Sequence, residues 1–303
     1  MSGDAGQKAT VTATFSRRMT LRLDDASEVT ARIRGKRMRP VVGDYVVAAP
    51  IPNEPEWLIE SIEDRQNELA RPDSRGRTEV LAANVSLVVV MAAAEPKPDW
   101  FIVDRYLAAA ENMRAAAVVA LNKTDVDGAD ALFADVATVY EQCGYPVVQC
   151  SAETGDGVDK LGDLLRGETA IFVGQSGVGK SSVINRLVAG ADQRTAEISG
   201  STGEGRHTTV NSVMLDLAGG GVVIDSPGVR DFAPALETPA EVMHGFREIA
   251  AIADQCRFAN CQHRQEPDCA VKAAVASGEI DERRFESYRR LLSLTRNLTE
   301  RRY

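Results

Sequence analysis

The chain has 303 residues, of which 44% are hydrophobic and 26% are charged. These values are typical of a globular protein and exclude a wholly disordered chain, collagen and a coiled coil. The formal net charge of −9 argues against a surface uniformly coated in nucleic-acid-binding charge, although it leaves room for local basic faces. At about 150 residues per domain, the length indicates two domains or three small ones.

The apolar runs and the cysteines indicate the cellular compartment of the protein. The longest uninterrupted apolar run, Leu87 to Ala94, is far shorter than the ~18 residues that a membrane span requires. The first residues, MSGDAGQK, contain no apolar core of a secretory signal. Three of the five cysteines lie between 256 and 269, which suits a metal in a reducing compartment better than a disulfide framework. We therefore expect a soluble, cytoplasmic protein.

The amino-terminal region reads as short strands separated by turns. Five segments alternate apolar and polar residues without a helical period: Val11–Phe15, Met19–Leu23, Glu28–Ile33, Asp44–Ala48 and Trp57–Ile62. This pattern predicts a small β-barrel, with a five-stranded OB-fold as the first choice and an SH3-like barrel as the second. The polar stretch Glu68–Arg77, which contains Pro72 and Gly76, is interpreted as a linker.

The middle of the chain alternates strands and helices. The expected strands are Leu87–Met91, Ala115–Leu121, Pro146–Cys150, Ala170–Val173, Val210–Leu217 and Gly221–Ile224. The expected helices are Asp99–Met113, Ala129–Cys143 and Lys180–Val188. Such alternation predicts a mostly parallel sheet covered on both faces, and the chain becomes helical from about Pro234. We expect a barrel domain over 1–72, an α/β domain over 73–233 and a helical domain over 234–303.

A phosphate-binding loop is the strongest motif. Gly174–Ser181 (GQSGVGKS) matches the P-loop pattern G-x-x-x-x-G-K-S/T, follows an apolar strand and opens a helix. Glycines allow backbone N–H groups to turn toward the phosphates, and the helix amino terminus adds a positive dipole. Lys180 is expected to reach the β- and γ-phosphates, and the Ser181 hydroxyl is expected to bind Mg²⁺.

Two further loops favour guanine. Asn122–Asp125 (NKTD) follows a strand directly, and Asp125 can accept hydrogen bonds from guanine N1–H and the exocyclic amine, a pair of donors that adenine lacks. Asn122 and Lys123 are expected to brace the loop and cover the base. Ser151 and Ala152 end the next strand, where a backbone N–H can meet guanine O6. A P-loop ATPase conflicts with this arrangement.

The γ-phosphate side needs two more segments. Asp225–Gly228 (DSPG) supplies a carboxylate for the Mg²⁺ shell and a glycine N–H, and Gly205–Thr209 (GRHTT) lies where a switch threonine belongs. Thr208 and Thr209 both qualify as the Mg²⁺ ligand, and Thr208 is the predicted one. Val229 stands where a Ras-type enzyme carries the water-positioning Gln, so His207 is the candidate catalytic residue, against the simpler reading of a histidine that contacts solvent or RNA.

The expected site is therefore assembled from segments in an unusual order. The guanine-recognition loops precede the P-loop, whereas they follow it in an ordinary GTPase, so the sequence is circularly permuted. The predicted GTP-binding residues are Asn122, Lys123, Thr124, Asp125, Ser151, Ala152, Gly174, Gln175, Ser176, Gly177, Val178, Gly179, Lys180, Ser181, Ser182, Thr208, Thr209, Asp225 and Gly228. The predicted Mg²⁺ ligands are Ser181, Thr208 and Asp225.

A Cys/His cluster lies near the carboxyl terminus. Cys256, Cys261, His263 and Cys269 provide three thiolates and one imidazole, a set suited to one closed, structural Zn²⁺. The spacing differs from the common C-x-x-C pairs. Cys143 and Cys150 are interpreted as buried packing residues.

The motifs together resemble the ribosome small-subunit-dependent GTPase A family (RsgA, also called YjeQ). The resemblance rests on the permuted GTPase motifs, Pro40–Asp44 (PVVGD) in the barrel, Gly205–Thr209 and the Cys/His cluster, and it spans residue 10 to the end. It implies an OB-fold, a permuted GTPase domain, a zinc domain and a role in late maturation of the small ribosomal subunit. The Gly-rich stretch 200–205 departs from the family pattern and bears on the switch geometry.

Two basic segments complete the expectation. Residues 17–39 carry eight basic side chains against three acidic ones, and residues 283–303 carry seven arginines against two glutamates. We interpret both as contacts to ribosomal RNA phosphates, with Tyr288 packing in a helix. The resulting hypothesis is a monomeric GTPase stimulated by the small (30S) subunit. The alternative is a GTP-toggled rRNA-binding checkpoint in which hydrolysis only resets affinity.

Overall fold

The computed structural model describes residues 6–15, 18–34, 38–72, 78–189, 212–225 and 236–300. The chain divides into two compact units. The first consists of the described residues within Met1–Leu87, Val158–Phe172 and Ser181–Phe232. The second consists of those within Val88–Gly157, Val173–Lys180 and Ala233–Tyr303.

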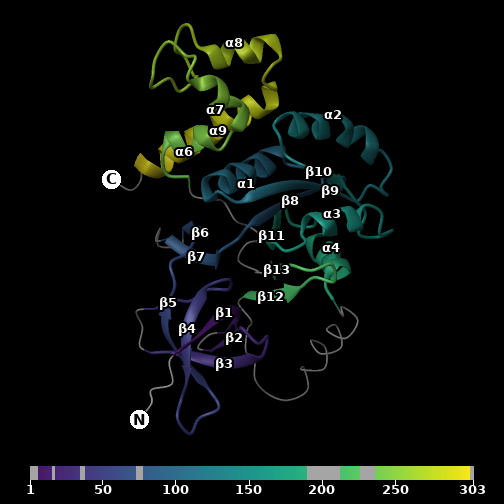
Figure 1. The fold of residues 1–303 in the computed structure, drawn as a ribbon. Helices are drawn as coiled ribbons and strands as arrows, with labels where there is room; N and C mark the ends of the chain where they lie inside the picture. The colour runs from purple at the N-terminus through teal and green to yellow at the C-terminus, as the bar shows by residue number, and fades with distance from the viewer. Residues whose placement is uncertain are drawn as a thin grey trace. The chain divides into compact units, whose positions relative to one another are not determined.

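The first unit contains a closed five-stranded barrel (Figure 1). Its strands are β1 (Gln7–Thr14), β2 (Met19–Leu23), β3 (Glu28–Ile33), β4 (Tyr45–Pro50) and β5 (Trp57–Ile62). The pairs β1–β2, β2–β3, β4–β5 and β1–β4 are antiparallel, and β3–β5 is parallel. This closed order, β1-β2-β3-β5-β4, confirms the predicted OB-fold.

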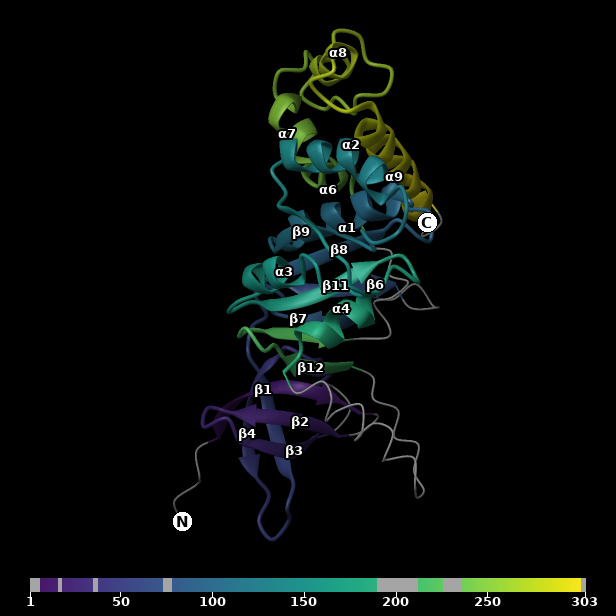
Figure 2. The same cartoon turned by 90° about the vertical axis from the view of Figure 1, so that its right-hand side faces the viewer.

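The alternating pattern of the barrel strands fills its interior. Val11, Leu21, Val46 and Ile59 have no solvent exposure, and on β2 buried side chains alternate with partly exposed ones. The barrel sheet then continues beyond β1. Ala13 pairs with Val213 of β12 (Ser212–Asp216), which pairs antiparallel with β13 (Val222–Asp225), which in turn pairs parallel with β11 (Thr169–Gly174). Helices α3 (Val158–Leu164) and α4 (Lys180–Leu187) complete this unit (Figure 2).

The interpretation of Glu68–Arg77 as a linker is wrong for its first residues. Strand β6 (Glu68–Pro72) pairs antiparallel with β7 (Thr78–Ala83), a strand that the polar pattern did not reveal. Leu69 of β6 is buried, as are Leu81, Ala82 and Ala83 of β7. The run Val80–Ala83 does not alternate with polar residues, and so short an apolar run does not distinguish a strand from a helix in a single sequence.

The second unit joins a parallel sheet to a helical carboxyl-terminal region. Strands β8 (Leu87–Ala93), β9 (Ala116–Asn122) and β10 (Val147–Gln149) are neighbours, with β9 and β10 parallel. Helices α1 (Trp100–Met113) and α2 (Ala129–Gln142) connect them, as expected. The carboxyl-terminal helices are α6 (Pro239–His244), α7 (Arg247–Ala253), α8 (Ala270–Ser277) and α9 (Glu282–Glu300). Within the described ranges, no helix combines the length and apolarity needed to cross a membrane.

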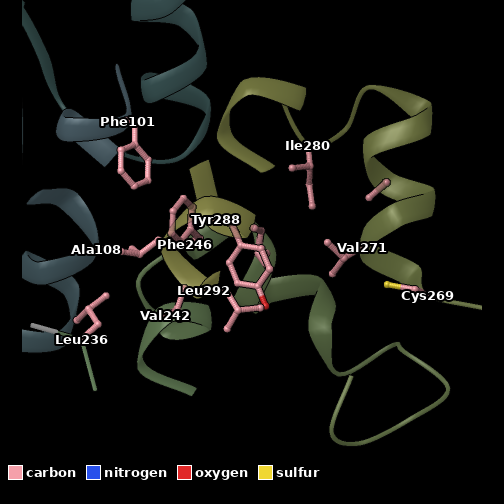
Figure 3. Packing of buried hydrophobic residues seen from close by; sticks show 13 residues of the cluster. Phe101, Ala108, Leu236, Val242, Phe246, Cys269, Val271, Ile280, Tyr288 and Leu292 are labelled. Carbon is pink, nitrogen blue, oxygen red and sulfur yellow. The ribbon is translucent and has the colours of Figure 1, made fainter. Parts of the chain in front are cut away.

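One hydrophobic core unites α1 with the carboxyl-terminal helices. Figure 3 shows Phe101 and Ala108 of α1 beside Phe246, Tyr288 and Leu292. The Phe246 and Tyr288 rings meet edge to face with centroids 5.6 Å apart. Tyr288 is almost fully buried, which confirms its predicted role in helix packing.

Candidate nucleotide site and metal centre

The P-loop connects the end of β11 to the start of α4. Gly174 and Gly179 adopt φ angles of +141° and +92°, a region that favours glycine. A Cβ at Gly174 would lie 2.2 Å from the Met91 carbonyl oxygen, and one at Gly179 would lie 2.3 Å from Asn122 Nδ2. The two glycines therefore allow the loop to approach both the neighbouring strand β8 and the loop after β9.

The P-loop lysine lies across its own loop. Lys180 Nζ donates hydrogen bonds to the carbonyl oxygens of Gly174, at 2.7 Å, and Gln175, at 2.9 Å. The ammonium group is thus held at the loop, where a nucleotide phosphate would offer it stronger, charged acceptors.

Asn122 joins the three loops of the nucleotide site in the second unit. Its side chain is almost fully buried at the carboxyl end of β9. Nδ2 donates to the Val178 carbonyl oxygen of the P-loop at 2.8 Å, and Oδ1 accepts from the Ala152 N–H at 3.0 Å. One amide therefore fixes the N-K-T-D loop against both the P-loop and the S-A loop.

The Asp125 carboxylate is exposed beside Ser151. Ser151 Oγ donates to Asp125 Oδ1 and accepts from the N–H groups of Glu153, at 3.2 Å, and Thr154, at 3.1 Å. These bonds hold one carboxylate oxygen in a fixed position at the end of the sheet. The arrangement can present the acceptor pair that guanine N1–H and its exocyclic amine require.

The remaining expected site residues divide into two groups. Ser181 and Ser182 lie in the first turn of α4, and Asp225 ends β13. His207, Thr208, Thr209, Gly228 and Val229 lie outside the described residues.

Sequence reasoning did not find one contact of the P-loop. The backbone N–H of Asp99 donates to Gln175 Oε1 at 3.3 Å, and Asp99 Oδ1 accepts from the Phe101 N–H at 3.1 Å as the N-cap of α1. An aspartate just before an apolar helix is a recognisable start signal, but its link to Gln175 depends on how distant segments pack.

The Cys/His cluster converges in the structure. The ligand atoms of Cys256, Cys261, His263 and Cys269 all lie within 4.8 Å of one another. Cys256 Sγ is 3.8 Å from Cys269 Sγ, and His263 Nδ1 lies 3.6 Å and 3.3 Å from the same two sulfurs. A tetrahedral zinc ion separates two sulfurs by about 3.8 Å and a sulfur from a nitrogen by about 3.6 Å, given its bond lengths.

The donor set therefore fits a closed metal site. Burial lowers the pKa of His263, which favours the neutral imidazole that binds metals. The cluster can hold a metal ion such as zinc, whose contribution there is to fix the loop rather than to react.

Glu266 organises the loop between the ligands. Its carboxylate accepts from the backbone N–H groups of Gln262 at 3.0 Å, Arg264 at 2.7 Å and Gln265 at 3.0 Å. Partial burial acts to raise the pKa of Glu266, but these donors outweigh it and lower the pKa to about 2. Tyr288 contributes from α9 through a 3.2 Å bond from its hydroxyl to the Gln262 carbonyl.

The basic segments are partly neutralised. Three arginines of the barrel segment pair with carboxylates: Arg18 with Glu56, Arg22 with Asp216 and Arg32 with Glu54. Arg283 and Arg284 of α9 bind Asp104, so their charge is used inside the second unit. Arg289 and Arg290 of α9 are exposed residues; Arg289 pairs with Glu286 at 3.1 Å, and the Arg290 guanidinium lies over the Phe101 ring.

The order of the nucleotide loops defines the class of protein. The N-K-T-D and S-A loops precede the P-loop, and Asn122 bonds both to the P-loop backbone and to the S-A loop, so the chain is a circularly permuted P-loop GTPase. The family model described as RsgA GTPase matches residues 62–234. The chain belongs to this RsgA GTPase family and is a GTP hydrolase.

Individual relatives are similar over most of the chain. A protein of Alcanivorax borkumensis named small ribosomal subunit biogenesis GTPase RsgA is 39% identical over 290 residues, covering 93% of this chain and 82% of that protein. One of the same name from Azotobacter vinelandii is 39% identical over 300 residues, covering 96% and 87%. The crystal structure of YjeQ from Thermotoga maritima has a TM-score of 0.77 at 30% identity, covering 95% of this chain and 98% of that one. The structure of YloQ, described as a circularly permuted GTPase, has a TM-score of 0.75 at 25% identity, covering 96% of each chain.

Proposed function

We propose that this GTPase acts in the cytoplasm as a monomer in late maturation of the small ribosomal subunit, and that the 30S subunit stimulates its hydrolysis of GTP. The observation that carries the nucleotide part is the buried amide of Asn122, which ties the guanine-recognition loop to the P-loop. The ribosomal part is supported by the names of the relatives, which are small-subunit biogenesis GTPases. Residues 1–72, 73–233 and 234–303 are proposed as the OB-fold, GTPase and zinc-binding domains.

The proposed roles follow the loops. Asp125 selects guanine, the Ala152 N–H lies near guanine O6, and Lys180 with the P-loop amides binds the phosphates. Ser181 and Asp225 offer the hard oxygen atoms that suit Mg²⁺, together with Thr208 or Thr209. When bound, Mg²⁺ would neutralise charge on the β- and γ-phosphates.

His207 is proposed to orient the attacking water. Val229 carries an isopropyl group, which can neither donate nor accept a hydrogen bond. An imidazole can do both near neutral pH, which is the reason for assigning His207 this role. The small subunit is proposed to raise the rate through this residue.

The proposed RNA contacts come from the barrel and from α9. On α9, Arg289 and Arg290 are the candidate phosphate ligands, because Arg283 and Arg284 are occupied by Asp104. Counterion release makes such binding fall steeply with salt, so affinity for the 30S subunit should drop between low and physiological ionic strength.

The deciding experiment measures phosphate release from GTP by the purified chain alone, with small subunits and with large subunits, using ATP as the control nucleotide. We expect stimulation by small subunits only, and its loss in His207→Ala while the Kd for GTP stays within a few fold. GTP-dependent binding to small subunits at an unchanged basal rate would instead support the rRNA-binding checkpoint, which Val229 favours.

A further inference from the structure

One continuous face of helix α1 contacts the carboxyl-terminal region. Successive turns of α1 make contacts with it at residues 101, 104, 108 and 111. The Arg290 guanidinium stacks 3.9 Å from the centre of the Phe101 ring, and Arg247 pairs with Glu111 at 2.7 Å. A Cβ at Gly245 would lie only 2.5 Å from the Ala108 Cβ, so the two segments are in close contact. The helix therefore cannot tilt without moving the carboxyl-terminal helices.

A buried charge network lies at the centre of this face. Asp104 of α1 and Arg284 of α9 both have zero exposure. Asp104 Oδ1 accepts from Arg284 Nη1 at 2.8 Å and from the Tyr140 hydroxyl at 2.9 Å, and Oδ2 accepts from Arg283 Nη1 at 3.1 Å. Arg284 also binds both oxygens of Glu248 on α7, at 2.8 and 3.0 Å.

The network balances two arginines against two carboxylates and joins α1, α2, α7 and α9. Well-packed apolar side chains often stabilise a core as well as a buried ion pair, so stability alone does not require these charges. Their bonds instead set a single geometry, because a displaced Asp104 would leave the buried Arg284 guanidinium with only one of its two carboxylate partners.

The amino end of α1 reaches the P-loop. Asp99, five residues before Asp104, donates its backbone N–H to Gln175 Oε1 and caps the helix. A Cβ at Gly177 would lie 3.5 Å from the Pro96 ring, so the segment that leads into α1 borders a second point of the P-loop. All of these residues belong to the second compact unit.

We propose that Asp104 is a positioning residue for the GTPase, which fixes α1 against α9 and thereby holds Gln175 and the P-loop in the conformation that binds phosphates. The carboxyl-terminal region then helps to hold the nucleotide site in place. The proposal concerns nucleotide binding by the isolated chain and does not depend on stimulation by a ribosomal subunit.

The test compares Asp104→Asn with Asp163→Asn. Asp163 lies on α3 and forms an exposed ion pair with Arg166, so this variant makes the same change outside the buried network. Equilibrium Kd values are measured for GDP and for inosine diphosphate, which lacks the exocyclic amine. We expect Asp104→Asn to raise the Kd values for GDP and for inosine diphosphate by the same factor, about 2- to 30-fold. The ratio of the two Kd values should stay unchanged, because the base pocket is intact. Asp163→Asn should match the unchanged chain.

Two further variants separate positioning from folding. Arg284→Lys keeps the charge and should weaken GDP binding less than Arg284→Gln. Gln175→Ala should weaken GDP binding, and its effect should not add to that of Asp104→Asn if both act through one contact. These two residues provide the test if Asp104→Asn does not fold.

The proposal is overturned if Asp104→Asn increases hydrogen exchange in α9 but leaves the Kd for GDP unchanged, since Asp104 would then only dock the helix. A changed ratio between the two nucleotides, or full additivity with Gln175→Ala, would also overturn it. Absence of ribosomal stimulation in the unchanged chain would count against the proposed function alone.

Discussion

The side-chain amide of Asn122 donates a hydrogen bond to the Val178 carbonyl oxygen over 2.8 Å, although the two residues lie 56 positions apart. This bond places the loop proposed to recognise guanine against the P-loop, which is proposed to bind the phosphates. On this proposal, recognition of the base and binding of the phosphates depend on one buried side chain.

Replacing Asn122 by alanine should weaken GDP binding. The change removes the bonds that Asn122 makes to the Val178 carbonyl and to the Ala152 N–H, and losses of this kind cost ~1–3 kcal/mol, or about 5- to 150-fold in Kd. Titration calorimetry with GDP measures the change in Kd, with Asn297→Ala at an exposed position of α9 as the control. An affinity equal to that of the control would show that the bond does not support the site.

Asp125→Asn should change the preferred base. Guanine would lose a charged acceptor for its amine, which costs ~1.5–3 kcal/mol, or about 10- to 150-fold in Kd. Xanthine carries a carbonyl in place of that amine, so the new carboxamide N–H can donate to it. Competition between GDP, XDP and ADP measures the change in preference: the affinity for XDP should rise, and the affinity for ADP should not. Retention of the GDP preference would remove Asp125 from base recognition.

The metal centre should contain one zinc ion per chain. We expect Cys269→Ala and His263→Ala to lose it, because three donors leave the tetrahedral shell incomplete. Cys150→Ser, which alters a buried thiol outside the cluster, should retain it. Metal analysis gives the stoichiometry, and a strong chelator should lower the melting temperature of the chain, since metal binding contributes folding free energy. Full metal content in both ligand variants would contradict the assignment.

Gly43→Ala should destabilise the barrel side of the first unit. Gly43 has φ of +93°, and a Cβ there would lie 2.1 Å from the Ala83 carbonyl oxygen. Backbone strain and this clash should together cost about 2 kcal/mol or more of unfolding free energy. Gly219→Ala, where a Cβ meets nothing within 4 Å, is the matched control. Equal urea midpoints for the two variants would show that the backbone relaxes at no cost.

Local sequence patterns predicted most of the strands and helices. The strands at Met19–Leu23, Glu28–Ile33 and Trp57–Ile62 have the predicted bounds, since alternation of buried and exposed side chains is a property of consecutive residues. The β6–β7 hairpin was not predicted, because the short apolar run Val80–Ala83 shows no alternation and does not distinguish a strand from a helix. The role of Arg283 and Arg284 also differs from the expected exposed basic segment, because a charge run does not show which of its members a distant carboxylate will bury.

The sequence by itself determined the chemistry carried by contiguous motifs. The P-loop, the N-K-T-D loop and the Cys/His cluster are short, and their chemistry follows from residue type and spacing. The tertiary structure decided which side chains act together: Asn122 with Val178 across 56 residues and Asp104 with Arg284 across 180. Such pairs depend on how whole strands and helices pack. Because a buried polar or charged group is costly without its bonding partner, each residue of the pair then requires the other.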